Sequence, residues 1–174
     1  VKTSHGEKFH SPHVVLATGH SAEDVFAHLR EIEVAMEGKS FAVGLRIEHP
    51  QKLINQLQYR DSAEDPRLGA ANYKLTNHNE KTGVGVYSFC MCPGGYILSS
   101  GTQTDGIVTN GMSNYARNSP FANAAIVVTI DHTKRFGKDD FGGMSFRRNL
   151  EQTAFKYSKH KSDGRAIPTQ KVQD

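Results

Sequence analysis

The segment Glu37–Ile47 reads EGKSFAVGLRI, and the pattern of the whole chain changes within it. Its second half alternates apolar side chains with small or charged ones, which is the period of a β-strand that buries one face. The sequence before it has the pattern of a strand followed by a helix, whereas the sequence after it has short strand-like segments separated by Gly and Asn. We therefore expect a domain boundary near residues 37–40, which divides the chain into parts 1–36 and 37–174.

The first part has the order of elements found in a Rossmann-type unit. A polar hairpin over residues 1–10 precedes the apolar run Val14–Ala17, whose continuous hydrophobicity is typical of a strand in a parallel sheet. A glycine turn follows, and then Ser21 with Asp24 three residues later, a pair that predicts a capping box for a helix over 21–36. Strand, tight turn and helix in this order indicate the edge of a dinucleotide-binding fold.

The second part predicts a series of short strands with two helices. The spacing of its turn residues favours antiparallel meanders over βαβ units. The predicted fold class is therefore α+β, with the end of a Rossmann-type unit followed by a mainly antiparallel, β-rich domain with a few helices. We expect strands over 41–47, 72–77, 85–92, 95–100, 106–109 and 124–131, and helices over 51–58 and 145–158.

Composition argues against several classes of protein. The 21 basic residues are scattered among 18 acidic ones, which gives a net charge of +3 without the clustered basic face of a nucleic-acid-binding protein. No apolar run approaches the roughly 20 residues of a membrane helix. The nine histidines lack metal-ligand spacing, and two cysteines fit a reducing compartment. We expect a cytoplasmic protein without a metal site and without nucleic-acid or membrane partners.

The most unusual stretch is Tyr87–Tyr96, YSFCMCPGGY. In an extended strand Cys90 and Cys92 would lie on one face, about 7 Å apart, which disfavours a disulfide between them. Pro93 would end the strand, and the two glycines that follow permit a tight turn and a close backbone approach. Two readings stay open: a loop that lies against a cofactor or substrate with thiols nearby, or small core residues beside an ordinary Pro-Gly turn.

Two further polar groups are candidates for a site. Arg46 and Glu48 share one face of their predicted strand, where they can pair with each other in solvent, and His49 stands at the strand end, a common place for functional groups. Asn110 begins an Asn-Gly pair that predicts a turn, and the loop through Ser113 is either a plain corner or the polar rim of a pocket.

Four of these segments together resemble one family. In order and spacing they are similar to bacterial FAD-dependent dehydrogenases, also called NAD(FAD)-utilising dehydrogenases, and the resemblance extends from about residue 10 to residue 170. The segments that carry it are VVLATGH (14–20), FAVGLRIEHP (41–50), GVYSFCMCPGG (85–95) and VTNGMS (108–113).

The resemblance implies a longer parent protein that binds FAD and runs a redox reaction at the flavin, with NAD(P)H as a possible co-substrate. This chain would be an internal fragment: residues 1–36 the end of the FAD-binding domain, and 37–174 an inserted substrate-side domain that is incomplete at its C-terminal end. The parent's N- and C-terminal FAD-binding segments would be missing. The resemblance implies that Ala17, Thr18 and Gly19 approach the FAD and that the Cys90–Gly95 loop faces the flavin or the substrate, with Pro93, Gly94 and Gly95 as further cofactor contacts. Our own inference adds Cys90 and Cys92 as candidates for catalysis. The polar residues Arg46, Glu48, His49, Asn110 and Ser113 are candidates for the substrate side.

Two alternatives remain beside the flavin oxidoreductase with an unknown small-molecule substrate. One is a non-catalytic module that binds a ligand or partner, and the other is a redox protein that uses the two thiols. On the first hypothesis we expect this chain to be inactive and to bind FAD weakly, because it lacks a Gly-rich pyrophosphate loop. We also expect strand 14–18 at a sheet edge, paired with residues 1–10 or with a second copy in a weak homodimer.

Overall fold

The computed structural model describes residues 1–101, 103–159 and 166–172. The chain divides into two compact units, Val1–Met36 and Glu37–Asp174. The division falls where the sequence pattern changes. Each unit is described by itself.

Unit 1, residues 1–36, contains one helix and one small hairpin. Lys2 and Lys8 form an isolated antiparallel bridge, and the Gly6 amide donates to the Thr3 carbonyl at 3.0 Å. The predicted hairpin over residues 1–10 is thereby confirmed. Its contacts are local, so it does not provide a sheet for the rest of the unit.

The predicted strand over residues 14–18 is wrong for this structure. The segment has no strand hydrogen bonds within residues 1–36, and it does not pair with residues 1–10. The Val15 side chain is 89% exposed. A strand forms only where a neighbour satisfies its N–H and C=O groups, and unit 1 contains no such neighbour.

Helix α1 (Glu23–Glu31) is shorter than the predicted 21–36. Its N-cap is Ala22, which makes no side-chain cap hydrogen bond, so the predicted capping box of Ser21 and Asp24 is wrong. The helix ends before Glu33, which adopts a positive φ of 58°. That backbone conformation is left-handed and cannot continue a right-handed helix.

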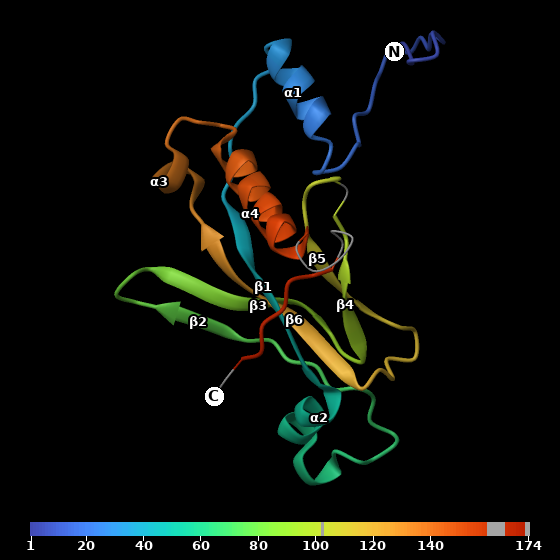
Figure 1. The fold of residues 1–174 in the computed structure, drawn as a ribbon, viewed down its shortest axis with the longest axis vertical. Coiled ribbons are helices and arrows are strands. Elements are labelled where there is room, and N and C mark those ends of the chain that lie inside the picture. Colours follow the sequence, from blue (N-terminus) through green and yellow to red (C-terminus); the bar gives the residue numbers. More distant parts are fainter. Residues whose placement is uncertain (102, 160–165, 173–174) are drawn as a thin grey trace. The chain divides into compact units, whose positions relative to one another are not determined.

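Unit 2, residues 37–174, is built on a four-stranded antiparallel sheet (Figure 1). Its order is β1 (Phe41–Pro50), β6 (Phe121–Ile130), β3 (Val84–Cys92) and β2 (Thr76–Asn79). β6 pairs with β1 along its full length and with β3 on its other side. The predicted α+β fold class with mainly antiparallel strands is confirmed, although β2 begins four residues later than expected.

A second sheet has two strands, β4 (Gly95–Ser99) and β5 (Thr109–Ser113). β5 begins at Thr109, the last residue of the predicted 106–109. The expected turn at Asn110 is wrong, because Gly111 pairs with Ile97 inside the hairpin. A Cβ atom at Gly111 would overlap the Arg46 guanidinium and the Asn123 amide oxygen. Glycine stands here because two side chains pack against the backbone, not because the chain turns.

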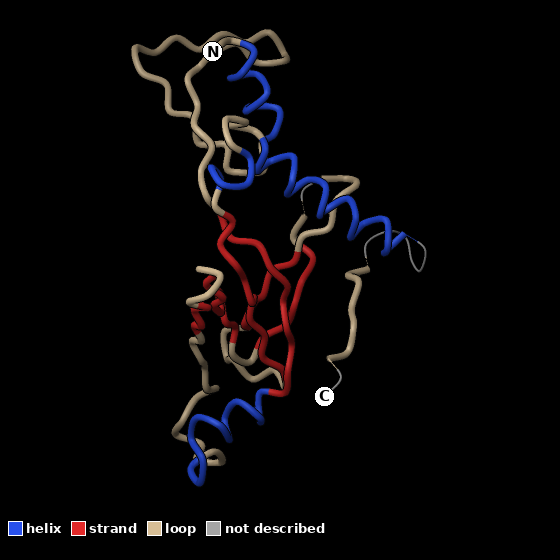
Figure 2. The backbone as a smooth tube through the Cα atoms, turned by 90° about the vertical axis from the view of Figure 1, so that its left-hand side faces the viewer, coloured by secondary structure: helices blue, strands red, loops and turns tan. Residues whose placement is uncertain are grey.

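Four helical segments complete unit 2. Helix α2 (Gln51–Tyr59) follows β1 directly, as predicted, and continues into the short 3-10 helix η1 (Arg60–Ser62). Figure 2 shows the strands of unit 2 with α2 beyond one end of the sheet. α4 (Gly142–Lys159) begins three residues earlier than expected, and α3 (His132–Phe136) was not predicted, since five residues are too few for an apolar period to be recognised.

The core of unit 2 is small. Ile54, Ala71 and Ala122 form a buried cluster between α2 and the sheet, with Met91 packed against it. A second apolar group is aromatic and joins β1 to the last two helices, through Phe41, Phe136 and Phe146.

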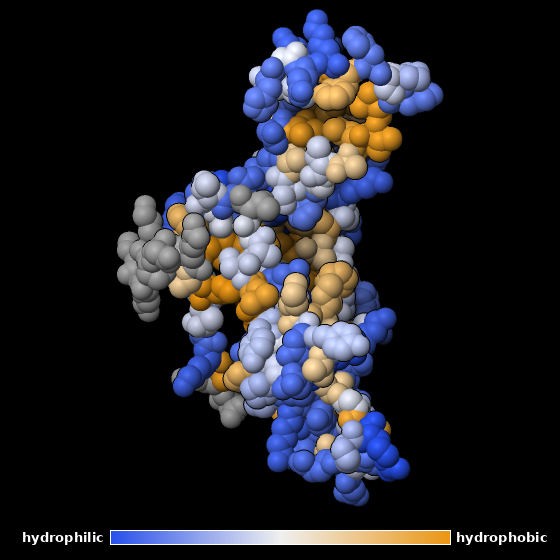
Figure 3. Space-filling model, turned by 90° about the vertical axis from the view of Figure 1, so that its right-hand side faces the viewer, coloured by the Kyte–Doolittle hydropathy of each residue, from blue (hydrophilic) through white to orange (hydrophobic). Residues whose placement is uncertain are grey.

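Large apolar side chains remain exposed around this core. Figure 3 shows apolar surface interspersed with polar surface on one face of the molecule. In unit 2 the exposed apolar side chains include Leu45, Leu57, Phe89, Tyr96, Met112 and Tyr157.

Candidate functional site

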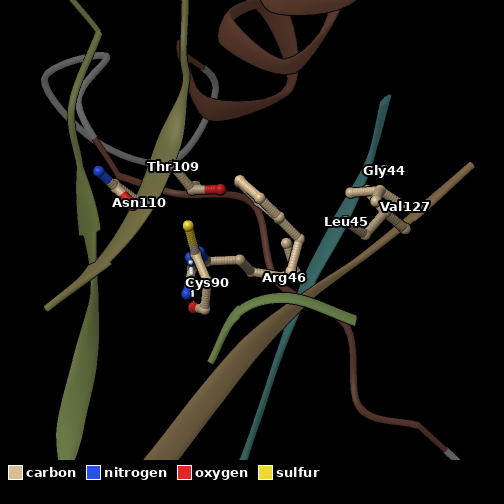
Figure 4. Close-up of a pocket in the computed structure, with 9 residues that line it drawn as sticks. Gly44, Leu45, Arg46, Cys90, Thr109, Asn110 and Val127 are labelled. Atoms are coloured by element: carbon tan, nitrogen blue, oxygen red, sulfur yellow. Dashed lines mark hydrogen bonds between the residues drawn. The ribbon is translucent and has the colours of Figure 1, made fainter. Parts of the chain in front are cut away.

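A pocket of about 210 Å³ lies where β1, β3, β5 and β6 meet (Figure 4). β1 and β6 pair in register there, so that Arg46 stands opposite Ala125. The bulged end of β3 supplies Cys90, and the start of β5 supplies Thr109. The full lining is Gly44, Leu45, Arg46, Phe89, Cys90, Thr109, Asn110, Ala125 and Val127.

Arg46 connects three strands around this pocket. Its Nη1 donates to the Asn123 side-chain oxygen on β6, and its Nη2 donates to the Cys90 carbonyl on β3 at 3.0 Å. Nη1 also lies 3.9 Å from the Cys92 sulfur. A guanidinium held at both terminal nitrogens has one preferred orientation, so the charge at the pocket is fixed in place.

The partner of Arg46 on β6 is fully buried. Asn123 is 0% exposed, and its amide nitrogen has no hydrogen-bond partner among the described residues. The amide oxygen must point to Arg46, because a guanidinium only donates hydrogen bonds. Asn123 is therefore a positioning residue for Arg46, and no pattern in the sequence around it indicates this role.

The two cysteines do not lie on one face of a regular strand, contrary to the prediction. The pairing of β3 with β6 shifts between Phe89 and Cys92, and Cys90 has a positive φ of 46°. A bulge of this kind redirects side chains. Cys90 is exposed and lines the pocket, whereas Cys92 is half-buried and its thiol donates to the Cys90 carbonyl at 3.4 Å; both are free thiols.

The predicted pairing of Arg46 with Glu48 is also wrong. Arg46 reaches across the sheet to β3 and β6, and Glu48 is exposed. His49 shares a 2.8 Å hydrogen bond with the Tyr73 hydroxyl. Burial raises the pKa of Tyr73, and the positive charge of Arg46 partly opposes this. His49 and Glu48 do not line the pocket that contains Arg46.

The Pro-Gly-Gly turn is buried against its own chain. Pro93 ends β3 as predicted, and the Gly94 amide donates to the buried Gln51 side chain at 2.7 Å. A Cβ atom at Gly94 would overlap the Arg117 backbone, and one at Gly95 would overlap the Met112 backbone. The close approach predicted for these glycines is thus made to other strands and loops, and contact with a cofactor stays a prediction.

The β5 candidates divide into two. Asn110 lines the pocket, and its side-chain oxygen accepts from the Gly111 amide at 2.8 Å. Ser113 is half-buried at the far end of β5, opposite Gly95, and is not part of the lining. Thr109 belongs to the segment 108–113 singled out in the sequence, but it was not named as a site residue. Gly44 was missed; a glycine inside a strand signals close backbone approach, and that signal at Gly44 was present in the sequence.

The residues described here do not by themselves fit a flavin dinucleotide. Such a cofactor needs a Gly-rich turn and a helix N-terminus that is free to receive its pyrophosphate. In unit 1 the exposed Ala17–Gly19 segment precedes α1, whose first turn carries Glu23 and Asp24, and these carboxylates repel phosphate. The pocket in unit 2 is smaller than the roughly 300–1,000 Å³ of most ligand sites.

Other classes of site receive no support from residues 1–101, 103–159 and 166–172. Within these ranges no three His, Cys, Asp or Glu side chains gather as ligands for a metal ion. Nor does any helix in them have the length and apolar character needed to span a membrane.

Comparison with known proteins identifies the family. The model for "FAD-dependent protein, C-terminal domain-like" matches residues 40–174. An uncharacterized protein of Clostridium beijerinckii is 47% identical over 143 residues, which are 82% of this chain and 27% of that relative. The chain thus spans about a quarter of the length of the curated relative it matches. It belongs to the family of FAD-dependent proteins, through the domain described as C-terminal in that family.

Proposed function

We propose that this chain is the substrate-side part of a longer FAD-dependent oxidoreductase, a dehydrogenase in which the pocket of unit 2 adjoins the flavin. The flavin supplies the redox chemistry when bound, and this chain supplies the groups that hold and orient a substrate. The family match supports a flavin-dependent parent. The substrate-side role and the dehydrogenase reaction are our own inference.

One observation carries the substrate-side role: a fixed cation and an exposed thiol share one pocket. Arg46 is oriented by the buried Asn123, and Cys90 is turned out of its strand by a bulge with a positive φ. Non-glycine residues rarely adopt that conformation, and it costs free energy that a purely structural strand would avoid. An orientated charge beside a redirected thiol suits the binding of a reactant.

Residues 1–36 would belong to the FAD-binding domain of the parent, with Ala17, Thr18 and Gly19 near the cofactor. The exposed side chains of Val14, Val15 and Leu16 support this, since an apolar run in water lacks the neighbours that it would bury against. Most of the cofactor's hydrogen bonds would come from the rest of the parent. The free thiols suit a reducing compartment, and we place the parent in the cytoplasm with NAD(P)H as its co-substrate.

The test uses the full-length parent. We expect one bound FAD per chain and anaerobic bleaching of the flavin by NADH or NADPH. Replacing Cys90 with Ala should slow turnover at least tenfold and leave FAD content unchanged. Arg67→Gln, at an exposed residue outside the pocket lining, should leave the rates unchanged.

Two results would contradict the proposal. A parent that binds FAD but is reduced by neither nucleotide would not be an NAD(P)H-dependent dehydrogenase. If Cys90→Ala leaves turnover unchanged, then the exposed Cys90 thiol takes no part in the reaction. Ligand binding without any flavin reactivity would favour the alternative, a non-catalytic binding module.

A further inference from the structure

We propose that the pocket of unit 2 binds the carboxylate of a small organic acid, with Arg46 as its counter-ion. This names the substrate class and rests on the proposed function for its place beside the flavin. The recognition itself depends only on residues of this chain.

Among the described residues that line the pocket, Arg46 is the only charged one. Among the described residues no carboxylate forms an ion pair with it, and its hydrogen bonds go to an amide oxygen, a carbonyl and a thiol. A half-buried cation with only neutral partners keeps its full charge available for an anion. Hydrogen bonds from a guanidinium to a carboxylate are about twice as strong as neutral ones.

The Arg46 guanidinium also has N–H donors that form no hydrogen bond with the described residues. It carries five N–H groups, and three hydrogen bonds to the chain are present. Because these bonds hold both terminal nitrogens, the ligand does not have to order the side chain on binding. Preorganisation of this kind raises affinity by lowering the entropy lost in the complex.

The remaining lining selects against highly charged or large ligands. The Thr109 hydroxyl has no hydrogen-bond partner in the described part of the chain, and Figure 4 shows it on the strand toward which the Cys90 sulfur points. Phe89, Ala125 and Val127 provide apolar surface. The pocket volume of about 210 Å³ is below that of most ligand sites, so it favours a small ligand. One cation, one hydroxyl and an apolar wall suit a monocarboxylate with a short apolar body.

Cys90 provides a direct assay for this charge selectivity. Iodoacetate and iodoacetamide alkylate thiols by the same reaction, in which the S–C bond forms, iodide leaves and the thiol proton passes to solvent. They differ in that one carries a carboxylate and the other a neutral amide. The ratio of their rates at Cys90 cancels the fraction of thiolate, which affects both reagents equally, and so reports attraction of the carboxylate.

We expect Arg46→Gln to lower the iodoacetate-to-iodoacetamide rate ratio at Cys90 by about three- to tenfold, measured by mass spectrometry of the Cys90 peptide. Arg46→Lys keeps the charge but not the planar donor geometry and should retain part of the ratio. Arg67→Gln removes an exposed arginine that is ion-paired with Asp65 and is the matched control; its ratio should equal that of the wild type. An unchanged ratio in folded Arg46→Gln would overturn the proposal.

A second measurement needs no variant and so decides the matter if Arg46→Gln fails to fold. Sodium benzoate or butyrate should protect Cys90 of the wild-type chain from iodoacetamide in a saturable manner. Sodium phosphate or chloride at equal ionic strength should protect it less. Equal protection by phosphate would overturn the assignment to carboxylates, and absence of protection by any anion would overturn the site.

Both measurements use this chain without FAD, so they separate the two proposals. Carboxylate binding by a chain whose parent shows no flavin reduction would leave the pocket's specificity intact and remove the proposed function. An active parent whose Cys90 shows no preference for iodoacetate would leave the proposed function intact and remove the proposed carboxylate site.

Discussion

The two units of this chain contain equally clear strand patterns, yet only one of them forms a sheet. Val14–Ala17 in unit 1 is more uniformly apolar than the start of β1 in unit 2. β1 pairs with β6 over ten residues, whereas residues 14–17 have no strand partner and are exposed. No residue of 1–36 is buried.

The two strand patterns differ in whether their unit contains a second strand with which they can pair. A strand gains its stability from cross-strand hydrogen bonds and from burial of a face, and both require partners elsewhere in the chain. Unit 2 contains β6, which forms backbone hydrogen bonds with β1 on one side and with β3 on the other. The contrast predicts that unit 1 acquires its structure from residues of the parent protein outside these 174.

Hydrogen exchange should show the largest effect of this contrast. Amides of the central strand β6 should open only with the whole domain, at a free energy on the order of 5–15 kcal/mol. Amides of residues 14–17 should exchange at close to the rate of an unfolded peptide, with a free energy of opening near zero. Protection of residues 14–17 in the monomeric chain would contradict the contrast.

Truncation of one apolar side chain in each unit should give a smaller difference, measured in the free energy of unfolding. Ile54→Ala, in the buried cluster of unit 2, should lower the free energy of unfolding by about 2–5 kcal/mol, because it leaves a cavity. Leu16→Ala in unit 1 removes an exposed side chain of the same size and should change it by less than about 0.5 kcal/mol. Urea denaturation followed by circular dichroism measures both; comparable losses would show that unit 1 has a core of its own.

A glycine substitution sharpens the comparison within unit 2. Gly111→Ala should cost about 1–3 kcal/mol, since the new methyl group overlaps Arg46 and Asn123. It should also reduce the iodoacetate preference of Cys90, because Arg46 must move. Gly69→Ala is the control, with no atom within 4 Å of the added methyl group, and should leave stability unchanged or slightly higher. Equal stability of the two variants would refute the packing role of Gly111.

The smallest effect concerns Asp105, which joins the segment before β5 to α4. Hydrogen bonds from Gln152 and then Arg148 lower the pKa of its carboxyl group. A lowered pKa in the folded state stabilises the fold above the unfolded value of about 3.9, and this contribution disappears as the pH falls through the folded value.

The stability difference between wild type and Asp105→Asn should therefore be present at neutral pH, begin to fall at about pH 3.9 and vanish only below the lowered folded pKa. Thermal unfolding across this range measures it, with Glu80→Gln as a control for loss of an exposed carboxylate. A difference that persists undiminished in acid would show that the carboxylate's charge is not what stabilises this contact.

Two glycine motifs show how far the sequence could predict the fold. Pro93-Gly94 turns as expected, because proline cannot donate to the strand and Gly94 takes a positive φ of 53°. The Asn-Gly pair at residue 110 has an equally strong turn signal but lies inside β5. The conformation at Pro93-Gly94 follows from the two residues themselves. The conformation at Asn110-Gly111 depends on packing against Arg46 and Asn123, which lie far from it in sequence.

The candidate site divides in the same way. Residue type was enough to single out Arg46, Cys90 and Asn110, and all three line one pocket. The orientation of Arg46 depends on Asn123, and the exposure of Cys90 depends on a register shift in β3. Both arise from strand pairing between distant segments, which no local pattern specifies.

The central claim, that the pocket of unit 2 adjoins the flavin of the parent, can be tested by one titration. Benzoate added to the full-length protein should shift the visible absorbance spectrum of bound FAD in a saturable manner. Arg46→Gln should abolish the shift while FAD content stays the same. A spectrum that does not change, although benzoate protects Cys90 from alkylation in the same sample, would contradict the claim by separating the pocket from the flavin.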